Sequence, residues 1–267
     1  MQVGVVFWPL VDVSPEHETV PTDKPIRDRK NAYFFIRNPP LRSGLPQHGS
    51  TELAYDGDEE MNMIKLYGHP FSLNARKVHW ALEELGLSYE YQVVHLPKGE
   101  HKKAEFLALN PAGRIPVLTD GDTKVSESNA IVLYLAEEYG RGKLVPDDKK
   151  ARGLLLQWMF WQVSDGSTTL SRPWYLRIVA PMLTQQPSDE TAIAQAVANA
   201  AAPLRFLDAA LASSTYLAGS DFSAADICVG EAVLLAQTGG VDIGAYANVS
   251  RWASLVSSRP ACVKTRP

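Results

Sequence analysis

The sequence predicts an α/β domain over residues 63–141 and an all-helical domain over residues 148–267. In the first range, short segments rich in β-branched and aromatic residues alternate with segments of helical periodicity, and in the second range no strand pattern returns. Hydrophobic residues make up 45% of the chain and charged residues 21%, which is typical of a soluble globular protein. We therefore expect two folded domains joined by the turn-rich linker GRGKLVPDD.

Residues 1–62 differ from the rest of the chain. They hold seven of its 18 prolines and end in an acidic run at 56–60. Prolines at this density interrupt both helices and strand ladders. We expect a poorly ordered extension that the working protein does not need, with Met63 just before the first predicted strand.

The segments of the α/β domain follow the order strand, helix, strand, helix, strand, strand, helix. Their expected ranges are strand 64–67, a helix that ends at Gly86, strand 88–94, helix 100–109, strands 115–118 and 123–125, and helix 127–139. The first two strands must be parallel because a helix crosses between them, and the turn at 120–122 makes a hairpin of the last two. This is the order of a thioredoxin-like domain.

A polar turn, His69-Pro70-Phe71-Ser72, lies between the first strand and the first helix. The first N–H groups of a helix are unpaired and the helix dipole is positive there, so such a turn favours an anion. Ser72 is the candidate for contacting that anion, and the alternative is that it only caps the helix. Asn74 is a further candidate for either role.

Pro116 stands at the start of a strand that should be central to the sheet. A central proline cannot donate to the ladder, so it belongs at a strand start or in a cis bond. A cis Ile115–Pro116 bond would turn the Ile115 backbone N–H and C=O outward, where they could pair with an extended peptide. A plain trans turn is the alternative.

In the helical domain, helices are expected at 149–163, 188–212, 224–237 and 249–257. Ser223 and Asp226 stand three residues apart before an apolar run, which is a variant capping box with Asp in place of the usual Glu. We expect Asp226 to be buried and structural, and Cys228 to lie in the core.

Charge and cysteine content exclude several kinds of protein. The net charge of -4 gives no reason to expect nucleic acid or an anionic membrane as a partner. Two cysteines are too few for a disulfide scaffold or a four-ligand zinc site, so we expect no metal and a reducing, cytoplasmic environment. No apolar run approaches the roughly 20 residues that a membrane-spanning helix needs.

Three segments resemble the glutathione transferase family: YGHPFSLNARKVHWALEEL, GEHKKAEFLALNPAGRIPVL and SESNAIVLYLAEEYG. They stand in the family's order and spacing, and the resemblance runs from Met63 to the C-terminus. It is most similar to the serine-type members of the bacterial and plant phi kind. Tyr67 is a second candidate, because tyrosine-type members carry their catalytic tyrosine near the end of the first strand. Disulfide-exchanging relatives have a cysteine at the turn, and this sequence has none there.

The resemblance implies a role for each matching residue. Ser72 would donate a hydrogen bond to the glutathione thiolate, which is worth about 1.5–3 kcal/mol and would lower the thiol pKa by roughly one to two units. His101 and Lys102 match the pair that holds the glycine carboxylate, although a solvated charged face is the alternative for them.

The same resemblance gives the remaining contacts with glutathione. The cis bond between Ile115 and Pro116 would present backbone groups to the peptide. Ser128, with its backbone N–H, would hold the γ-glutamyl carboxylate, and Glu127 would accept from the amine. The alternative is that Glu127 only complements the helix dipole while Ser126 or Ser128 caps the helix.

The implied activity is glutathione transfer in cytoplasmic detoxification: the glutathione thiolate attacks a small hydrophobic electrophile. The resemblance also implies the glutathione transferase fold, a homodimer, and no cofactor other than glutathione as co-substrate. A glutathione-dependent isomerase, peroxidase or dehalogenase on the same scaffold is an alternative, and so is a non-catalytic protein-interaction module. Aromatic residues at helical spacing are more typical of a core than of the electrophile pocket; those in question are Trp158, Trp161, Trp174 and Tyr175.

Overall fold

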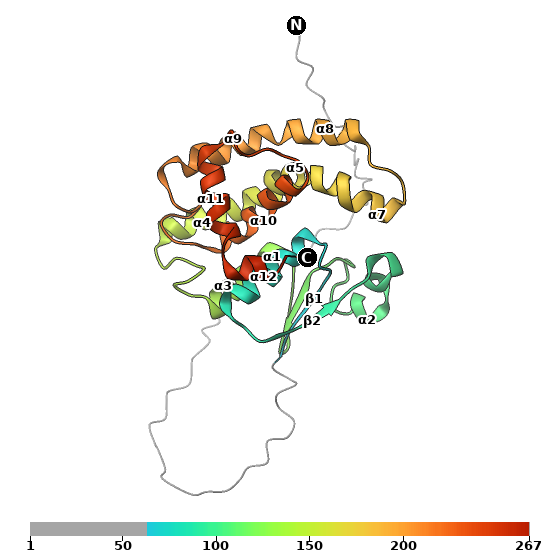
Figure 1. Cartoon of the computed structure of the whole chain (residues 1–267). Helices are drawn as coiled ribbons and strands as arrows, with labels where there is room; N and C mark the ends of the chain where they lie inside the picture. Colours follow the sequence, from blue (N-terminus) through green and yellow to red (C-terminus); the bar gives the residue numbers. More distant parts are fainter. Residues whose placement is uncertain (1–62, 267) are drawn as a thin grey trace, which may run out of the picture. The chain divides into compact units, whose positions relative to one another are not determined.

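The computed structural model describes residues 63–266, and the predicted extension over residues 1–62 lies outside the described residues. The described residues belong to one compact unit, in which a four-stranded sheet with its helices lies beside a set of further helices (Figure 1). Within this part of the chain, no helix has the length and apolar character needed to cross a membrane.

The sheet has the strand order β2-β1-β3-β4. Its strands are β1 (Ile64–Gly68), β2 (Tyr89–Val93), β3 (Val117–Asp120) and β4 (Thr123–Ser126). β1 pairs in parallel with β2 and antiparallel with β3, and β3 and β4 form an antiparallel hairpin. The predicted parallel pair and the predicted hairpin are both confirmed, and β1 lies inside the sheet because it has a neighbour on each side.

Helices flank the sheet at the points where the chain leaves its strands. They are α1 (Leu73–Leu85), the short α2 (Ala104–Leu107) and α3 (Ser128–Tyr139). α1 ends at Gly86, which has a φ of 67° and donates its N–H to the last carbonyls of the helix, as the sequence predicted. The single helix expected over 100–109 is instead a 3₁₀ turn, η3 (Glu100–Lys102), followed by α2, because Lys103 between them is extended.

The rest of the chain is helical. Its α-helices are α4 (Lys149–Trp161), α5 (Ser167–Leu170), α6 (Arg172–Trp174), α7 (Ala180–Thr184), α8 (Glu190–Asn199), α9 (Ala201–Ala210), α10 (Ala224–Thr238), α11 (Ala247–Ser257) and α12 (Pro260–Lys264). Two π-helical turns, η4 (Gln162–Gly166) and η5 (Tyr175–Val179), interrupt the path between α4 and α7. The helix expected over 188–212 is two helices, α8 and α9, which lie on the side away from the sheet (Figure 1).

α10 forms the centre of the helical part and joins it to the sheet domain. It packs against α1 and α3 of the sheet domain and against α4 and α11 of the helical part, and nearly every residue along it is buried. The predicted capping box at its start is present: the Asp226 carboxylate accepts from the Ser223 N–H at 2.9 Å, and the fully buried Asp226 also accepts from Trp252 Nε1 at 2.8 Å. The expectations that Asp226 is buried and that Cys228 lies in the core are confirmed.

A buried ion pair crosses from α1 to α10. Arg76 Nε lies 2.9 Å from Glu231 Oε1, and Arg266 approaches the other oxygen of the same carboxylate at 3.5 Å. Burial raises the pKa of Glu231, and the neighbouring arginines oppose that effect.

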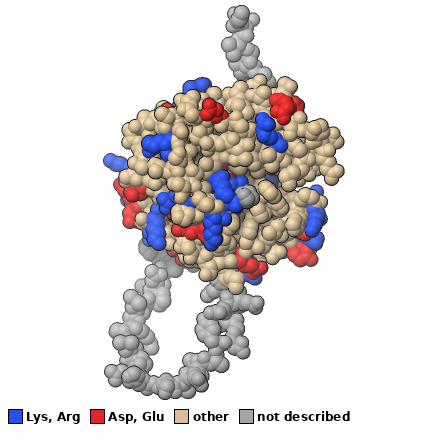
Figure 2. Space-filling view, viewed as in Figure 1, with Lys and Arg blue, Asp and Glu red and all other residues tan. Residues whose placement is uncertain are grey.

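On the face seen in Figure 2, the exposed Lys and Arg side chains are interspersed with Asp and Glu side chains. The charges on this face do not form one continuous patch of a single sign.

Candidate functional site

Ser72 is the N-cap of α1. Its backbone is extended, its N–H donates to the His69 carbonyl at 2.8 Å, and its Oγ accepts from the Ala75 N–H at 3.3 Å. A hydroxyl that accepts one hydrogen bond still has its own proton to donate. The capping role is therefore present, and it leaves Ser72 able to donate to an anion at the same helix terminus.

Glu127 and Ser128 stand where β4 passes into α3. Glu127 is the N-cap residue and has a φ of 69° and a ψ of 111°, a backbone conformation that is uncommon outside glycine and that concentrates at binding sites. Its side chain is exposed, whereas Ser128 is 7% exposed. The Ser128 hydroxyl donates to Asn74 Oδ1 at 3.2 Å, so the first turns of α3 and α1 are directly joined.

Two adjacent cavities open at these helix ends. Ser72 lines a cavity of about 610 Å³ together with His69 and residues of α6 and α7. Glu127 and Ser128 line a second cavity of about 640 Å³. Asn74 contributes to both linings, so the predicted thiol position and the predicted glutamyl position are neighbours in one region between the sheet domain and the helical part.

The buried Lys77 side chain holds the start of α3 in place by a hydrogen bond. Lys77 is 1% exposed, and its Nζ donates to Asn129 Oδ1 at 2.6 Å and to Gln162 Oε1 at 3.2 Å. Asn129 in turn donates to the Met159 carbonyl at 2.8 Å. Burial lowers the pKa of Lys77, and the nearby Cys228, Glu231 and Glu127 oppose this effect. This network could not be predicted from the sequence, in which Lys77 looks like an ordinary polar residue of an amphipathic helix.

The Ile115–Pro116 bond is cis, as predicted. In the part of the chain that the structure describes, the Ile115 N–H and C=O have no hydrogen-bond partner, so both are available to an extended peptide. Asn110 Nδ2 holds the preceding loop by donating to the Arg114 carbonyl at 2.8 Å. The Arg114 side chain lines the same cavity as Glu127 and Ser128. Sequence reasoning missed Arg114, although it lies inside the quoted segment next to Ile115.

Comparison with known proteins decides the family. The glutathione S-transferase N-terminal domain model matches residues 62–137, and the C-terminal domain model matches residues 174–260. The chain belongs to the glutathione S-transferase family. It is 35% identical over 212 residues to glutathione S-transferase 3 of Zea mays, a match that covers 77% of this chain and 94% of the relative.

Other relatives agree with this assignment. Glutathione S-transferase GstB of Escherichia coli K12 is 34% identical, with 76% of this chain and 97% of the relative covered. Among solved structures, glutathione S-transferase-I bound with lactoylglutathione has a TM-score of 0.71 and 28% identity over 76% of this chain and 98% of that one. The predicted enzyme class, a glutathione transferase, and the predicted fold, a thioredoxin-like domain followed by an all-α domain, are confirmed.

His101 and Lys102 are the remaining predicted glutathione contacts of this transferase, and the His101 carbonyl lies against Gly113, two residues before Ile115. Both belong to η3, and neither lines the cavity of Ser72 or that of Glu127. Lys102 is exposed, whereas His101 Nδ1 is buried and has no hydrogen-bond partner among the described residues. An unpaired buried ring nitrogen leaves one polar group free for a ligand, so His101 stays a prediction with one supporting observation.

Tyr67 and Ser72 line different cavities. Tyr67 pairs within the sheet with Gln92 and Val117 and lines a cavity of about 920 Å³ beside β2 and α2. Asn74, which separates the thiol and glutamyl positions, does not line that cavity. The geometry therefore favours Ser72 over Tyr67 as the residue next to the thiol.

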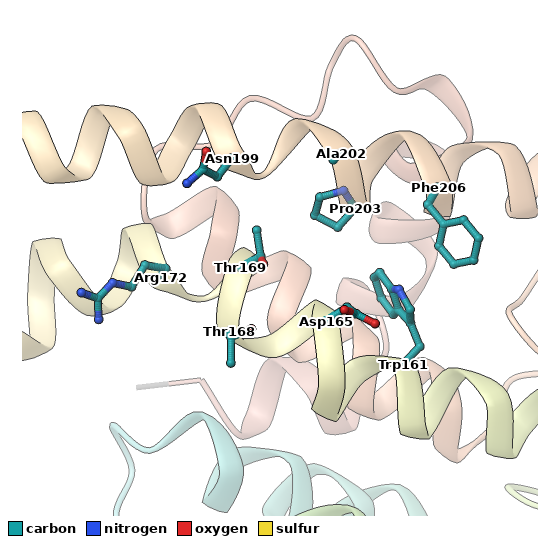
Figure 3. A pocket seen from close by; sticks show the side chains of 9 residues that line it. All are labelled: Trp161, Asp165, Thr168, Thr169, Arg172, Asn199, Ala202, Pro203 and Phe206. Carbon is teal, nitrogen blue, oxygen red and sulfur yellow. The ribbon is translucent and has the colours of Figure 1, made fainter. Parts of the chain in front are cut away.

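The four aromatic candidates divide between pocket and core. Trp174 and Tyr175 line the cavity of Ser72, while Trp158 is buried in the main core. Trp161 lies on a separate cleft of about 590 Å³ between α5 and the α8–α9 pair, where it faces Phe206 (Figure 3). Of the four aromatic candidates for the electrophile pocket, Trp174 and Tyr175 therefore line the cavity of Ser72, and Trp158 and Trp161 do not.

Proposed function

We propose that this protein is a cytoplasmic, homodimeric glutathione transferase of detoxification that activates the glutathione thiol through Ser72. Glutathione would lie from the Glu127–Ser128 pair, past Ile115 and Pro116, to the turn before α1, with His101 and Lys102 at its glycine end. A small hydrophobic electrophile would occupy the cavity of about 610 Å³ next to Ser72. No cofactor other than glutathione is required.

The observation that carries this proposal is the hydrogen bond between Ser128 and Asn74. It holds Ser128 next to the helix terminus that Ser72 caps, which supports a single tripeptide that reaches both positions. Two helices of ordinary length then direct their positive ends toward the same ligand, which carries a carboxylate at one end and a thiolate near its middle.

The chemistry requires little from Ser72 beyond a hydrogen bond. Its proton stabilises the thiolate relative to the thiol, so more of the bound glutathione is ionised at neutral pH. The thiolate electron pair forms a bond to the electrophilic carbon, and the leaving group departs with the electron pair of the bond that breaks. Ser72 keeps its own proton throughout, and so it acts as an electrostatic stabiliser and not as a nucleophile.

A substrate panel and one substitution test the proposal. The wild-type protein is expected to be retained on immobilised glutathione and to turn over chlorodinitrobenzene. Ser72→Ala is expected to raise the pKa of the bound thiol by roughly one to two units, as followed by thiolate absorbance, while Ser72→Thr keeps most of the effect. An unchanged thiol pKa in Ser72→Ala would overturn the mechanism even if the enzyme were active.

Two other outcomes correspond to the alternatives. Retention on glutathione with turnover only of peroxides, isomerisable ketones or haloalkanes assigns the protein to a different branch on the same scaffold. Failure of both retention and turnover favours a non-catalytic interaction module.

Two neighbouring exposed apolar side chains at the end of α4 support the homodimer. Phe160 is 69% exposed and Val163 is 57% exposed, and both lie at the rim of the cavity that Glu127 lines. Large apolar side chains exposed together are typical of interaction surfaces. Sedimentation of the wild-type protein and of Phe160→Glu is expected to give a dimer and a weakened dimer respectively.

A further inference from the structure

The cavity next to Ser72 combines an apolar lining with positive charge. Among the described residues that line it, Arg172 is the cation, His69 and His95 add imidazole rings, and there is no Asp or Glu. Its remaining lining is largely apolar and aromatic, formed by Phe71, Leu73, Leu96, Pro97, Trp174, Tyr175, Val179, Met182 and Leu183. Cavities of this kind select ligands by a few convergent polar groups against an apolar wall.

Arg172 is the cation of this cavity that has no carboxylate partner. Within residues 63–266, no ion pair involves Arg172, and its guanidinium carbon lies 5.3 Å from the centroid of the Tyr175 ring. The next arginine, Arg177, differs: it lies 3.8 Å from Glu190 and also donates to the Gly239 carbonyl at 3.2 Å. Arg172 is thus held over an aromatic face with its donors free.

Arg172 also reaches the edge of the separate cleft in Figure 3, together with Asp165. In that view Arg172 lies at the end away from Trp161 and Phe206, whereas Asp165 lies beside Trp161. The Asp165 carboxylate accepts instead from the Ser164 hydroxyl at 2.9 Å. Among residues 63–266, no ion pair joins Arg172 to Asp165, which is the acidic residue that lines the neighbouring cleft.

His69 contributes a hydrogen-bond donor to this cavity, whereas Arg172 contributes a positive charge. The Phe71 N–H donates to His69 Nδ1 at 3.3 Å, so a neutral His69 carries its proton on Nε2 and can donate from there. Burial lowers the pKa of His69, and the nearby His95 lowers it further. His69 therefore adds a neutral donor near Ser72, and Arg172 supplies the cation further along the lining.

We propose that the electrophile of this transferase carries an anionic group, such as a carboxylate, on an apolar or aromatic body, and that Arg172 binds that group. The inference rests on the proposed function and names the substrate class of its second cavity. A planar guanidinium that lies over a ring can donate two parallel hydrogen bonds to a carboxylate. The apolar body would then lie against Trp174 and the α7 side chains, with its reactive carbon toward Ser72.

A matched pair of electrophiles tests the proposal. Chlorodinitrobenzoate and chlorodinitrobenzamide share the reacting carbon and the chloride leaving group, and they differ in the charge of one substituent. In Arg172→Gln, kcat/KM for the benzoate is expected to fall about tenfold more than kcat/KM for the amide. Arg172→Lys keeps the charge and is expected to retain most of the preference. Arg205 is an exposed arginine of α9 that lines neither the cavity of Ser72 nor the cleft in Figure 3. The control variant Arg205→Gln is therefore expected to leave kcat/KM unchanged for both substrates.

A binding measurement makes the result independent of turnover. Dinitrobenzoate and dinitrobenzamide lack the leaving group, and their binding to the full chain can be followed by calorimetry with glutathione present or absent. The benzoate is expected to bind about tenfold more weakly to Arg172→Gln than to the wild type, with the amide unchanged. If the wild type turns over neither chloro compound but shows this difference, the proposed function fails and the anion site stands.

Two outcomes would overturn the inference. Equal loss for the benzoate and the amide in Arg172→Gln, together with a raised thiol pKa of bound glutathione, would mean that Arg172 acts on the thiolate. No loss for either compound, in turnover and in binding, would mean that Arg172 is only a solvated surface residue.

Discussion

The hydroxyl of Ser128 donates a hydrogen bond of 3.2 Å to Oδ1 of Asn74, and this bond joins the first turns of α3 and α1. The residues on its two sides are 54 apart in the sequence. One side is proposed to hold the glutamyl end of glutathione, and the other side leads to Ser72. Together with the packing of α1 against α3 and the Lys77–Asn129 hydrogen bond between the same helices, this contact sets the spacing between the two ends of the proposed ligand site.

A double-mutant cycle on this contact should show coupling in glutathione affinity. Ser128→Ala and Asn74→Ala are each expected to weaken glutathione binding, and the double variant is expected to lose about 1 kcal/mol less than the sum. Calorimetry of the four proteins measures the cycle. Additive losses would show that the two residues contact glutathione independently and do not position each other.

Replacement of Asp226 should affect stability and not the site. The fully buried carboxylate accepts hydrogen bonds from the N–H groups of Ser223, Leu217 and Trp252. An amide in its place would point its own N–H groups at some of these N–H groups, which leaves them without acceptors. Asp226→Asn is expected to lower the free energy of unfolding by about 3 kcal/mol, measured by urea titration.

The exposed Asp221 provides the control for that substitution. It accepts from the hydroxyl of the neighbouring Ser220, so Asp221→Asn is expected to change the free energy of unfolding by less than about 0.5 kcal/mol. Equal effects of the two substitutions would contradict a special role for the buried carboxylate.

Acidification should destabilise the protein partly through His79. Burial lowers the pKa of His79, and the Glu83 carboxylate, 3.8 Å from Nε2, offsets only part of that effect. As the pH falls below about 6.5, the unfolded imidazole takes up a proton before the folded one does. The contribution of His79 to the free energy of unfolding is therefore fully present above about pH 6.5, and it is lost as the pH falls toward the pKa of His79 in the folded protein.

Urea unfolding of wild type and His79→Gln between about pH 7.5 and pH 5.5 measures this share. The substitution is expected to reduce the slope of stability against pH by at most about 1.4 kcal/mol per pH unit. A slope that does not change would assign the acid sensitivity to other groups.

A chain that begins at Met63 should keep the properties of the full chain. The match to Zea mays glutathione S-transferase 3 covers 94% of that relative with 77% of this chain. Retention on immobilised glutathione and solubility are expected to be unchanged after removal of residues 1–62. Loss of either in the shortened chain would show that the extension belongs to the working protein.

Features that depend on local sequence could be predicted. The capping box of α10 is set by residues three apart, Ser223 and Asp226, and the stop of α1 is set by Gly86. For Pro116 the rule that a central proline cannot donate to a strand ladder left a cis bond or a trans turn open, and the order of the strands favoured the cis bond that the structure has. The candidate contacts with glutathione came from resemblance, and of these the structure brings Ser72 and Ser128 to adjacent cavities.

Features that depend on distant residues could not be predicted. Lys77 is buried only because Asn129 and Gln162 accept from it, at separations of 52 and 85 residues. The helix expected over 188–212 breaks near Ala200, where Pro203 supplies no N–H and therefore suits the first turn of a new helix. The apolar period of the sequence passes through this break without a change.

The π-helical turn at η4 sets the direction of the residues that follow it. A π turn holds one residue more than an α turn, and one residue corresponds to a rotation of about 100° around the helix axis. Ser167 and Thr168 come directly after η4 and line both cavities at the site. Gain or loss of a single codon here would therefore rotate a wall that both cavities share while leaving the turn that carries Ser72 in place, so one inserted or deleted residue would alter the proposed electrophile position and the proposed glutamyl position together.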